Sequence, residues 1–288
     1  MFASYAVVQG SSADMVMSDI AAIVTGETNV ANLSVACDKG LTHITTIQPP
    51  GWEVVDTWNT GGGPGRVFRA LNKNGTSYKY ARFALNDTYF YVQTGENWDP
   101  VTHTGYNFTG DQLAYSMLAQ YNGIIYIYAT SKYLILMPTA NGLSFGYAAV
   151  HELSGEAIEA GHPTHISVGS DITSPYNFSG IICRANVQTS SGDIGNGRLF
   201  IGPNFFTTGN NYLTHSPMTY QNSSGKIFLA AVPLMVTPQY GNHAPLGVLL
   251  DMLCTGTSQF DDFDTITYES VKYVLRRVNS ATLMIPLE

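Results

Sequence analysis

Charged side chains are scarce in this chain. Asp, Glu, Lys and Arg together make up 12% of the 288 residues, whereas about 25% is usual for a soluble domain. The 13 Lys and Arg are spread thinly and the formal net charge is −8, so no basic stripe could neutralise phosphates, which argues against nucleic acid as a partner. Uncharged polar residues and glycine must therefore cover the surface. Such a surface is typical of proteins buried against neighbours in an assembly, although a polar monomer would have the same composition.

Cysteine is also scarce. Cys37, Cys183 and Cys254 are odd in number, far apart and without CxxC spacing, which predicts buried free thiols and synthesis in a reducing compartment. The N-terminal segment lacks the basic start of a signal peptide, and no stretch reaches the ~18 apolar residues of a membrane span. We therefore expect a chain made in the cytoplasm, with no membrane among its partners.

Helical periodicity is limited to the N-terminal region. After a short strand at 5–8, the stretch Ser-Ser-Ala-Asp at 11–14 offers an N-cap, and Met15, Ile20, Ile23 and Val24 lie near one face until Gly26. We predict one helix at about 12–25. A weaker helical pattern at 29–38 predicts one or two further turns.

From Leu41 onward the pattern changes to short β-type runs separated by turn residues. The runs are 43–47, 51–58, 66–71, 77–85, 88–94, 123–130, 133–138, 145–153, 164–169, 197–202, 226–236, 247–253, 264–268 and 271–278. This pattern predicts a mainly β fold of antiparallel, sandwich or barrel-like sheets with one N-terminal helix. Two regions are expected, an N-terminal helix plus β region at 1–138 and a C-terminal β region at 139–288, although the turn residues at 138–142 also fit a hairpin loop within one domain.

The most chemistry-like stretch is HELSGEAIEAGHPTH at 151–165. A zinc-protease helix needs two histidines four residues apart, and the position four after His151 is Gly155. Gly161 and Pro163 also break any helix between His162 and His165. We therefore expect a polar loop between two strands, whose histidines would at most make a subunit contact depend on pH. A non-helical metal site built from the three histidines is the less favoured alternative.

Other candidate sites are weaker still. GGGPGR at 61–66 lacks the Lys-Ser/Thr of a phosphate-binding loop, so a tight or flexible connection is favoured. The cluster Asp261, Asp262 and Asp264 has too few oxygen ligands for a calcium loop and is interpreted as a loop leading into the strand DTITY. No GxSxG elbow or protease-like cysteine is present. We predict no catalytic, cofactor-binding or metal-binding residues, no cofactor, and a protein that is not an enzyme.

The aromatic residues allow two interpretations. Trp52, Trp58, Trp98 and the 18 tyrosines could stack on sugar rings, but aromatics in alternating β runs more often fill cross-strand pairs, cores or subunit contacts. The second interpretation is favoured.

Several segments together resemble a known group of proteins. Residues 5–56 read as a short strand, a helix ending in TGET, an NLS…CD stretch and a segment closing on Gly-Trp. YKYARFAL, GENWDP, THTGYN, YIYAT and YLILMP follow, and near the end come APLGVLLDMLC, DDFDTITYESVKYVL and TLMIPLE. Together they resemble structural proteins in the virions of tailed bacteriophages. The resemblance carries no catalytic residue across, and it places 151–165 in a loop between strands, with His162 where the group has an aromatic residue.

The resemblance implies a non-enzymatic virion component of the tail or baseplate, located in the virion. Its expected partners are other virion proteins and further copies of itself in a homo-oligomer. A receptor-binding β domain of a tail fibre or tip, with a host-surface glycan as partner, is the alternative. A capsid-associated decoration protein and a polysaccharide-depolymerising enzyme are less favoured.

Overall fold

The computed structural model of the chain describes residues 2–8, 10–27, 29–31, 33–34, 51–60, 63–72, 75–86, 89–106, 108, 112–115, 123–140, 144–145, 148–154, 165–174, 177–188, 194–199, 229–237, 244–255, 260–261, 264–278 and 281–287. Antiparallel strands dominate these residues, and they are accompanied by one helix near the N-terminus. The predicted mainly β, sandwich-like fold with one N-terminal helix is confirmed.

Helix α1 (Ala13–Val24) begins and ends as the sequence predicts. The Ser12 hydroxyl accepts a hydrogen bond from the Met15 amide at 3.2 Å, which satisfies one of the unpaired N–H groups of the first turn. The apolar face is Val16, Met17, Ile20, Ala21, Ile23 and Val24. Met15, which the sequence pattern placed near this face, is 54% exposed instead, because it precedes the buried stripe by one position.

Strand β1 (Phe2–Ala6) lies between β10 (Gly123–Thr130) and β2 (Leu33–Ser34). The helical prediction at 29–38 is wrong for Leu33 and Ser34, which pair with Tyr5 and Ser4 in extended conformation. Residues 35–38 and the predicted strand at 43–47 lie outside the described part of the chain.

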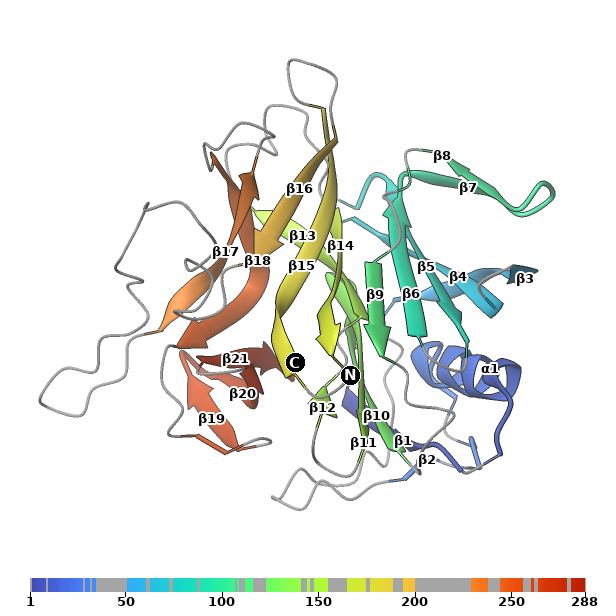
Figure 1. Ribbon diagram of the computed structural model, residues 1–288, viewed down its shortest axis with the longest axis horizontal. Helices are drawn as coiled ribbons and strands as arrows, with labels where there is room; N and C mark the ends of the chain where they lie inside the picture. Colours follow the sequence, from blue (N-terminus) through green and yellow to red (C-terminus); the bar gives the residue numbers. More distant parts are fainter. Residues whose placement is uncertain are drawn as a thin grey trace, which may run out of the picture.

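A five-stranded sheet follows, in the order β3 (Glu53–Thr60), β4 (Gly63–Leu71), β5 (Tyr78–Leu85), β6 (Tyr89–Gly95) and β9 (Gln112–Tyr115). Between β6 and β9, β7 (Asn97–Asp99) and β8 (Thr104–Tyr106) form a separate two-stranded hairpin. Figure 1 shows this hairpin projecting from the body of the molecule, on the same side as β3 and α1. The sequence pattern did not predict β7, β8 or β9.

The remaining strands form one large sheet of fourteen strands in the described residues, in the order β19-β20-β21-β18-β17-β16-β15-β14-β13-β11-β10-β1-β2, with β12 beside β11. Its further members are β11 (Tyr133–Ala140), β12 (Ser144–Phe145), β13 (Ala148–Ser154), β14 (His165–Ser174), β15 (Asn177–Gln188), β16 (Ile194–Leu199), β17 (Ala230–Thr237), β18 (Ala244–Thr255), β19 (Thr265–Tyr268), β20 (Val271–Val278) and β21 (Ala281–Pro286). A further pairing places Leu153 of β13 opposite Leu249 of β18.

The main core lies between the five-stranded sheet, α1 and one face of β1, β10, β11 and β13. Its buried members include Phe68, Phe83, Ile127, Leu134 and Val150. The alternate residues of β10, β11 and β13 point to the opposite face, as the two-residue period of a strand requires. There the Arg276 guanidinium lies over the Tyr126 ring and the Tyr133 hydroxyl donates to the Pro286 carbonyl. The central strands are therefore covered on both faces, by α1 and the five-stranded sheet on one side and by β20 and β21 on the other (Figure 1).

The proposed boundary at 138/139 falls within β11. This strand pairs with β10 on its N-terminal side and with β12 and β13 on its C-terminal side. The division into regions 1–138 and 139–288 stays a prediction.

Candidate functional site

The stretch HELSGEAIEAGHPTH begins inside β13. His151 and Glu152 are each 1% exposed, and His165, which begins β14, lies opposite Glu152 in the antiparallel register. The predicted loop is thus bounded by two strands. Residues 155–164, including His162, lie outside the described part of the chain.

His151 is enclosed between strands. Its ring centroid lies 6.0 Å from that of Tyr133, whose hydroxyl donates to the Pro286 carbonyl at 2.6 Å. Burial lowers the pKa of His151 to about 3, so this imidazole is neutral at pH 7. The expectation of a loop histidine at a pH-dependent subunit contact is therefore wrong for His151, because the strand carries it into the interior.

The other sequence candidates also have structural roles. Gly63 to Gly65 belong to β4, and the buried Arg66 guanidinium donates to Asp14 at 3.1 Å and to Ser18 at 2.6 Å, both on α1. It therefore joins the helix to the sheet, which argues against a phosphate-binding loop.

Two members of the aspartate cluster, Asp261 and Asp264, are hydrogen-bonded to each other ahead of β19. The Asp261 amide donates to the Asp264 carboxylate at 2.9 Å, and the Asp264 amide donates to the Asp261 carbonyl at 3.2 Å. Asp262 lies outside the described residues. In the part of the chain that the structure describes, no three His, Cys, Asp or Glu side chains are grouped to hold a metal ion.

The most unusual polar cluster is centred on Lys79 of β5. Its side chain and that of Glu152 are 0% and 1% exposed, with 2.8 Å between the Lys79 Nζ and Glu152 Oε1 atoms. The same ammonium donates to the carbonyls of Leu71, at 2.9 Å, and Ser131. It also lies 5.3 Å from the centre of the Trp52 ring. This cluster, hereafter the Lys79 junction, joins the five-stranded sheet to the large sheet.

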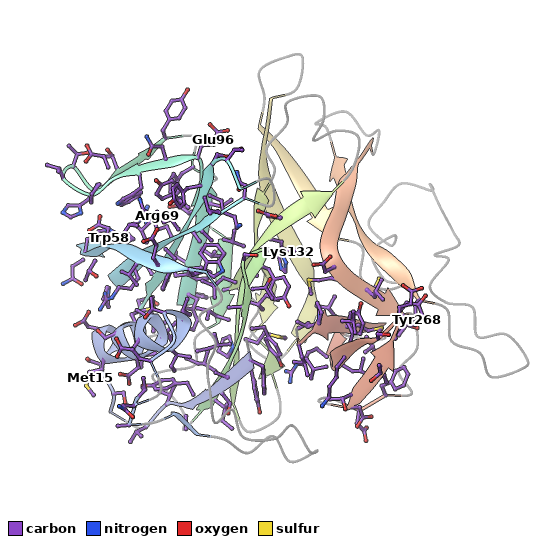
Figure 2. All side chains as sticks on the ribbon, turned by 180° about the vertical axis from the view of Figure 1, so that it is seen from behind. Met15, Trp58, Arg69, Glu96, Lys132 and Tyr268 are labelled. Carbon is purple, nitrogen blue, oxygen red and sulfur yellow. The ribbon has the colours of Figure 1, made fainter. Side chains whose placement is uncertain are left out.

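The β10–β11 turn supplies three successive carbonyl acceptors to the Lys79 junction. The Thr130 carbonyl accepts from the Trp52 indole N–H at 2.7 Å, the Ser131 carbonyl from Lys79, and the Lys132 carbonyl from the Glu152 amide at 2.8 Å. Figure 2 shows Lys132 near the middle of the molecule, with Trp58 and Arg69 on one side and Tyr268 on the other. One turn thus connects segments that are distant in sequence.

The chemistry of the Lys79 junction is that of a buried ion pair. Burial lowers the pKa of Lys79, and the Glu152 carboxylate opposes this shift. The three acceptors, Leu71, Ser131 and Glu152, match the three N–H donors of an ammonium group. The geometry therefore favours a charged, structural lysine over an amine nucleophile. Removing one partner of such a pair typically costs roughly 3–5 kcal/mol, since the other charge stays buried.

A second cluster is centred on the Asp56 carboxylate, whose side chain is 7% exposed. It accepts from the Trp98 indole N–H at 2.7 Å and from His103 Nδ1 at 2.8 Å. The Trp98 ring packs against those of Trp58 and Phe108, each with centroids 5.4 Å away. Asp56 thereby fixes the β7–β8 hairpin to β3.

The tip of this hairpin is folded by its own side chains. The Asp99 carboxylate accepts from the Thr102 hydroxyl and the Val101 amide, and these hydrogen bonds lower the pKa of Asp99. Val101 and Tyr106 are 85% and 65% exposed. The hairpin therefore presents two large apolar side chains on an anchored, projecting element.

The three tryptophan side chains pack or form hydrogen bonds within the fold. Trp52 and Trp98 are buried and donate their indole N–H groups to internal acceptors. Trp58 is half-buried, beside Gly65 and under the Arg82 guanidinium at 4.9 Å. The interpretation that the aromatics fill the core is confirmed for Trp52, in the main core, and for Trp98, in a smaller cluster against which Trp58 packs.

Comparison with known proteins gives no assignment: no family model matches the chain and no curated protein matches it. No helix in the described part of the chain combines the length and apolar character needed to cross a membrane.

Sequence reasoning missed Lys79 and Asp56. Glu152 was noticed only as part of a zinc-like motif, and Lys79 stands in YKYARFAL, an ordinary alternating strand. Its position on the inward face, with Ala81 and Phe83 two and four residues later, is the one local signal of burial.

Proposed function

We propose that this chain is a non-enzymatic structural component of a tailed-bacteriophage virion. Its place would be in the tail or baseplate, and it would act through oligomerisation and contacts with other virion proteins. The observation that carries the proposal is the resemblance of the sequence to virion proteins of tailed bacteriophages, which extends from the N-terminal strand and helix to the closing strands.

The fold supports the proposal at the segments that carry the resemblance. The strand expected at 5–8 overlaps β1 (Phe2–Ala6) only at residues 5 and 6, the expected helix is α1, YKYARFAL lies in β5, and the closing segments lie in β18 to β21. The polar clusters in the described residues have internal roles, with Lys79 and Arg66 joining elements of the fold. This pattern is expected of a protein with a structural role.

The surface gives further support. Of the large apolar side chains exposed in the described residues, Val101 and Tyr106 are the most exposed, and both belong to the β7–β8 hairpin, which projects in Figure 1. An anchored projecting element with exposed apolar groups suits a contact with another subunit, because burying such groups stabilises association.

Mass spectrometry of purified virions tests the proposal. Gradient-purified particles from a culture in which the gene is expressed should contain the chain at a fixed ratio to the major tail and head proteins. A phage-encoded enzyme that is not packaged serves as the control for carry-over from the lysate. Intact particles that lack the chain would contradict the proposal.

A further inference from the structure

The Lys79 junction does more than add one ion pair to the core. The main core beneath it is apolar, and apolar contacts are non-directional. Such packing selects an arrangement of the two sheet faces through the shapes of the side chains alone, and no single apolar contact fixes a direction. Hydrogen bonds to a buried ammonium, in contrast, require particular directions and distances.

The junction supplies this directionality at one place. The Lys79 ammonium reaches the end of β4 through Leu71, the β10–β11 turn through Ser131 and β13 through Glu152. Trp52, which precedes β3, adds its own bond to Thr130 of the same turn. The two sheets are thus joined by polar groups that converge on one side chain.

We infer that the Lys79 ammonium is a latch. It holds the five-stranded sheet against the β10–β11 turn and β13 in a single geometry, and without it the junction opens locally while both sheets stay folded. The latch does not depend on the proposed role in a virion, because it joins two sheets of one chain. Buried ionic groups in some other proteins are retained for specificity of this kind, since apolar residues of similar volume give equal or greater stability.

The double variant Lys79→Met/Glu152→Leu tests the latch. It removes both charges together, so neither is left buried alone, and folding is preserved. Hydrogen exchange of backbone amides is measured on the full chain by mass spectrometry. The backbone amides of residue 152 and of residues 131–133 should exchange about tenfold faster or more. The charged hydrogen bonds that hold the turn against the five-stranded sheet are lost, so the junction opens more often. Amides within β4 and β5 should exchange as in the wild type.

Lys132→Met is the matched control. Lys132 lies in the same turn, and its side chain pairs with Asp251 at the surface, so its loss should leave junction exchange unchanged. Three outcomes would overturn the latch: junction amides of the double variant as slow as in the wild type, uniform acceleration of all amides, or an equal effect of Lys132→Met. The first would mean that apolar packing suffices, the second that the pair contributes only global stability.

Discussion

At the scale of single residues, the burial of His151 makes the stability of the fold depend on pH. Burial lowers the pKa of His151 from 6.5 to about 3 in the folded protein, whereas in the unfolded chain the pKa of the imidazole is about 6.5. Between these values the unfolded state binds one more proton than the folded state. The contribution of a neutral His151 to stability is therefore complete above pH 6.5 and is lost as the pH falls toward 3, at about 1.4 kcal/mol per pH unit.

Urea unfolding at pH 7, 6 and 5 measures this effect. We expect the free energy of unfolding of the wild type to fall more steeply with acid than that of His151→Gln, by about 1 kcal/mol per pH unit below pH 6. The other titrating groups are shared, so their contributions cancel in the difference. Parallel pH curves for the two proteins would show that His151 is protonated equally in both states.

Gly105 of β8 is a second residue whose role is set by its neighbours. A Cβ atom there would collide with the Phe108 ring, which also contacts Gly95. Gly105→Ala should lower the free energy of unfolding by about 1–3 kcal/mol, the usual cost of overpacking. Chemical denaturation measures it, and Gly105→Ala/Phe108→Leu is the control, in which the smaller side chain should recover part of the loss. A neutral Gly105→Ala would mean that Phe108 moves aside freely.

At the scale of elements, the β19–β20 hairpin contains strain that can be removed. Tyr268 pairs with Val271, so Glu269 and Ser270 form a two-residue turn, with φ of 47° and 68°. Such turns favour glycine or asparagine, because other residues are strained in the left-handed region.

Ser270→Gly should raise the free energy of unfolding by about 0.5–1 kcal/mol, after allowance for the greater freedom of glycine in the unfolded chain. Ser270→Ala is the matched control, because it keeps the strain and should give no gain. Thermal and urea unfolding of the three proteins provide the measurement. Equal stability of the glycine and alanine variants would contradict the presence of backbone strain at Ser270.

Elements with local signals were predictable from the sequence. Ser12 and Gly26 bracket α1, and the run at 271–278 is β20 without a change of boundary. Hairpin β7–β8 was missed because its strands have three residues each, too short to show alternation. The sequence pattern placed His151 within the predicted strand at 145–153 but did not show that it is buried, because Tyr133, which packs beside it, belongs to another strand.

At the scale of the whole molecule, pairings between distant segments were beyond prediction. The first strand pairs with β10, placing Phe2 opposite Tyr128, and Lys79 meets Glu152 across two sheets. Nothing local to either partner identifies the other, because many alternating strands in this chain are interchangeable by pattern. The Lys79 junction and the Asp56 cluster therefore emerge only when the sheets are assembled.

The exposed hairpin gives the whole molecule its clearest candidate for a subunit contact. Among the described residues, Val101 and Tyr106 have little to pack against, being 85% and 65% exposed, while the hydrogen bond between Asp56 and Trp98 holds the hairpin in place. If the chain assembles as proposed, Val101→Asp/Tyr106→Ser should weaken association, because an apolar contact would be replaced by a desolvated charge.

Light scattering after size exclusion measures the mass of the wild-type assembly, and the variant should dissociate at concentrations about tenfold higher or more. Tyr268→Ser is the control. Tyr268 is also exposed, but it lies on β19, and in Figure 2 Lys132 stands between it and the β7–β8 hairpin. A wild-type oligomer that tolerates both variants equally would place the contact elsewhere and leave the virion role open to the particle test. A wild type that stays monomeric and is also missing from particles would contradict the proposed virion role, since neither self-association nor incorporation into the particle would then be found.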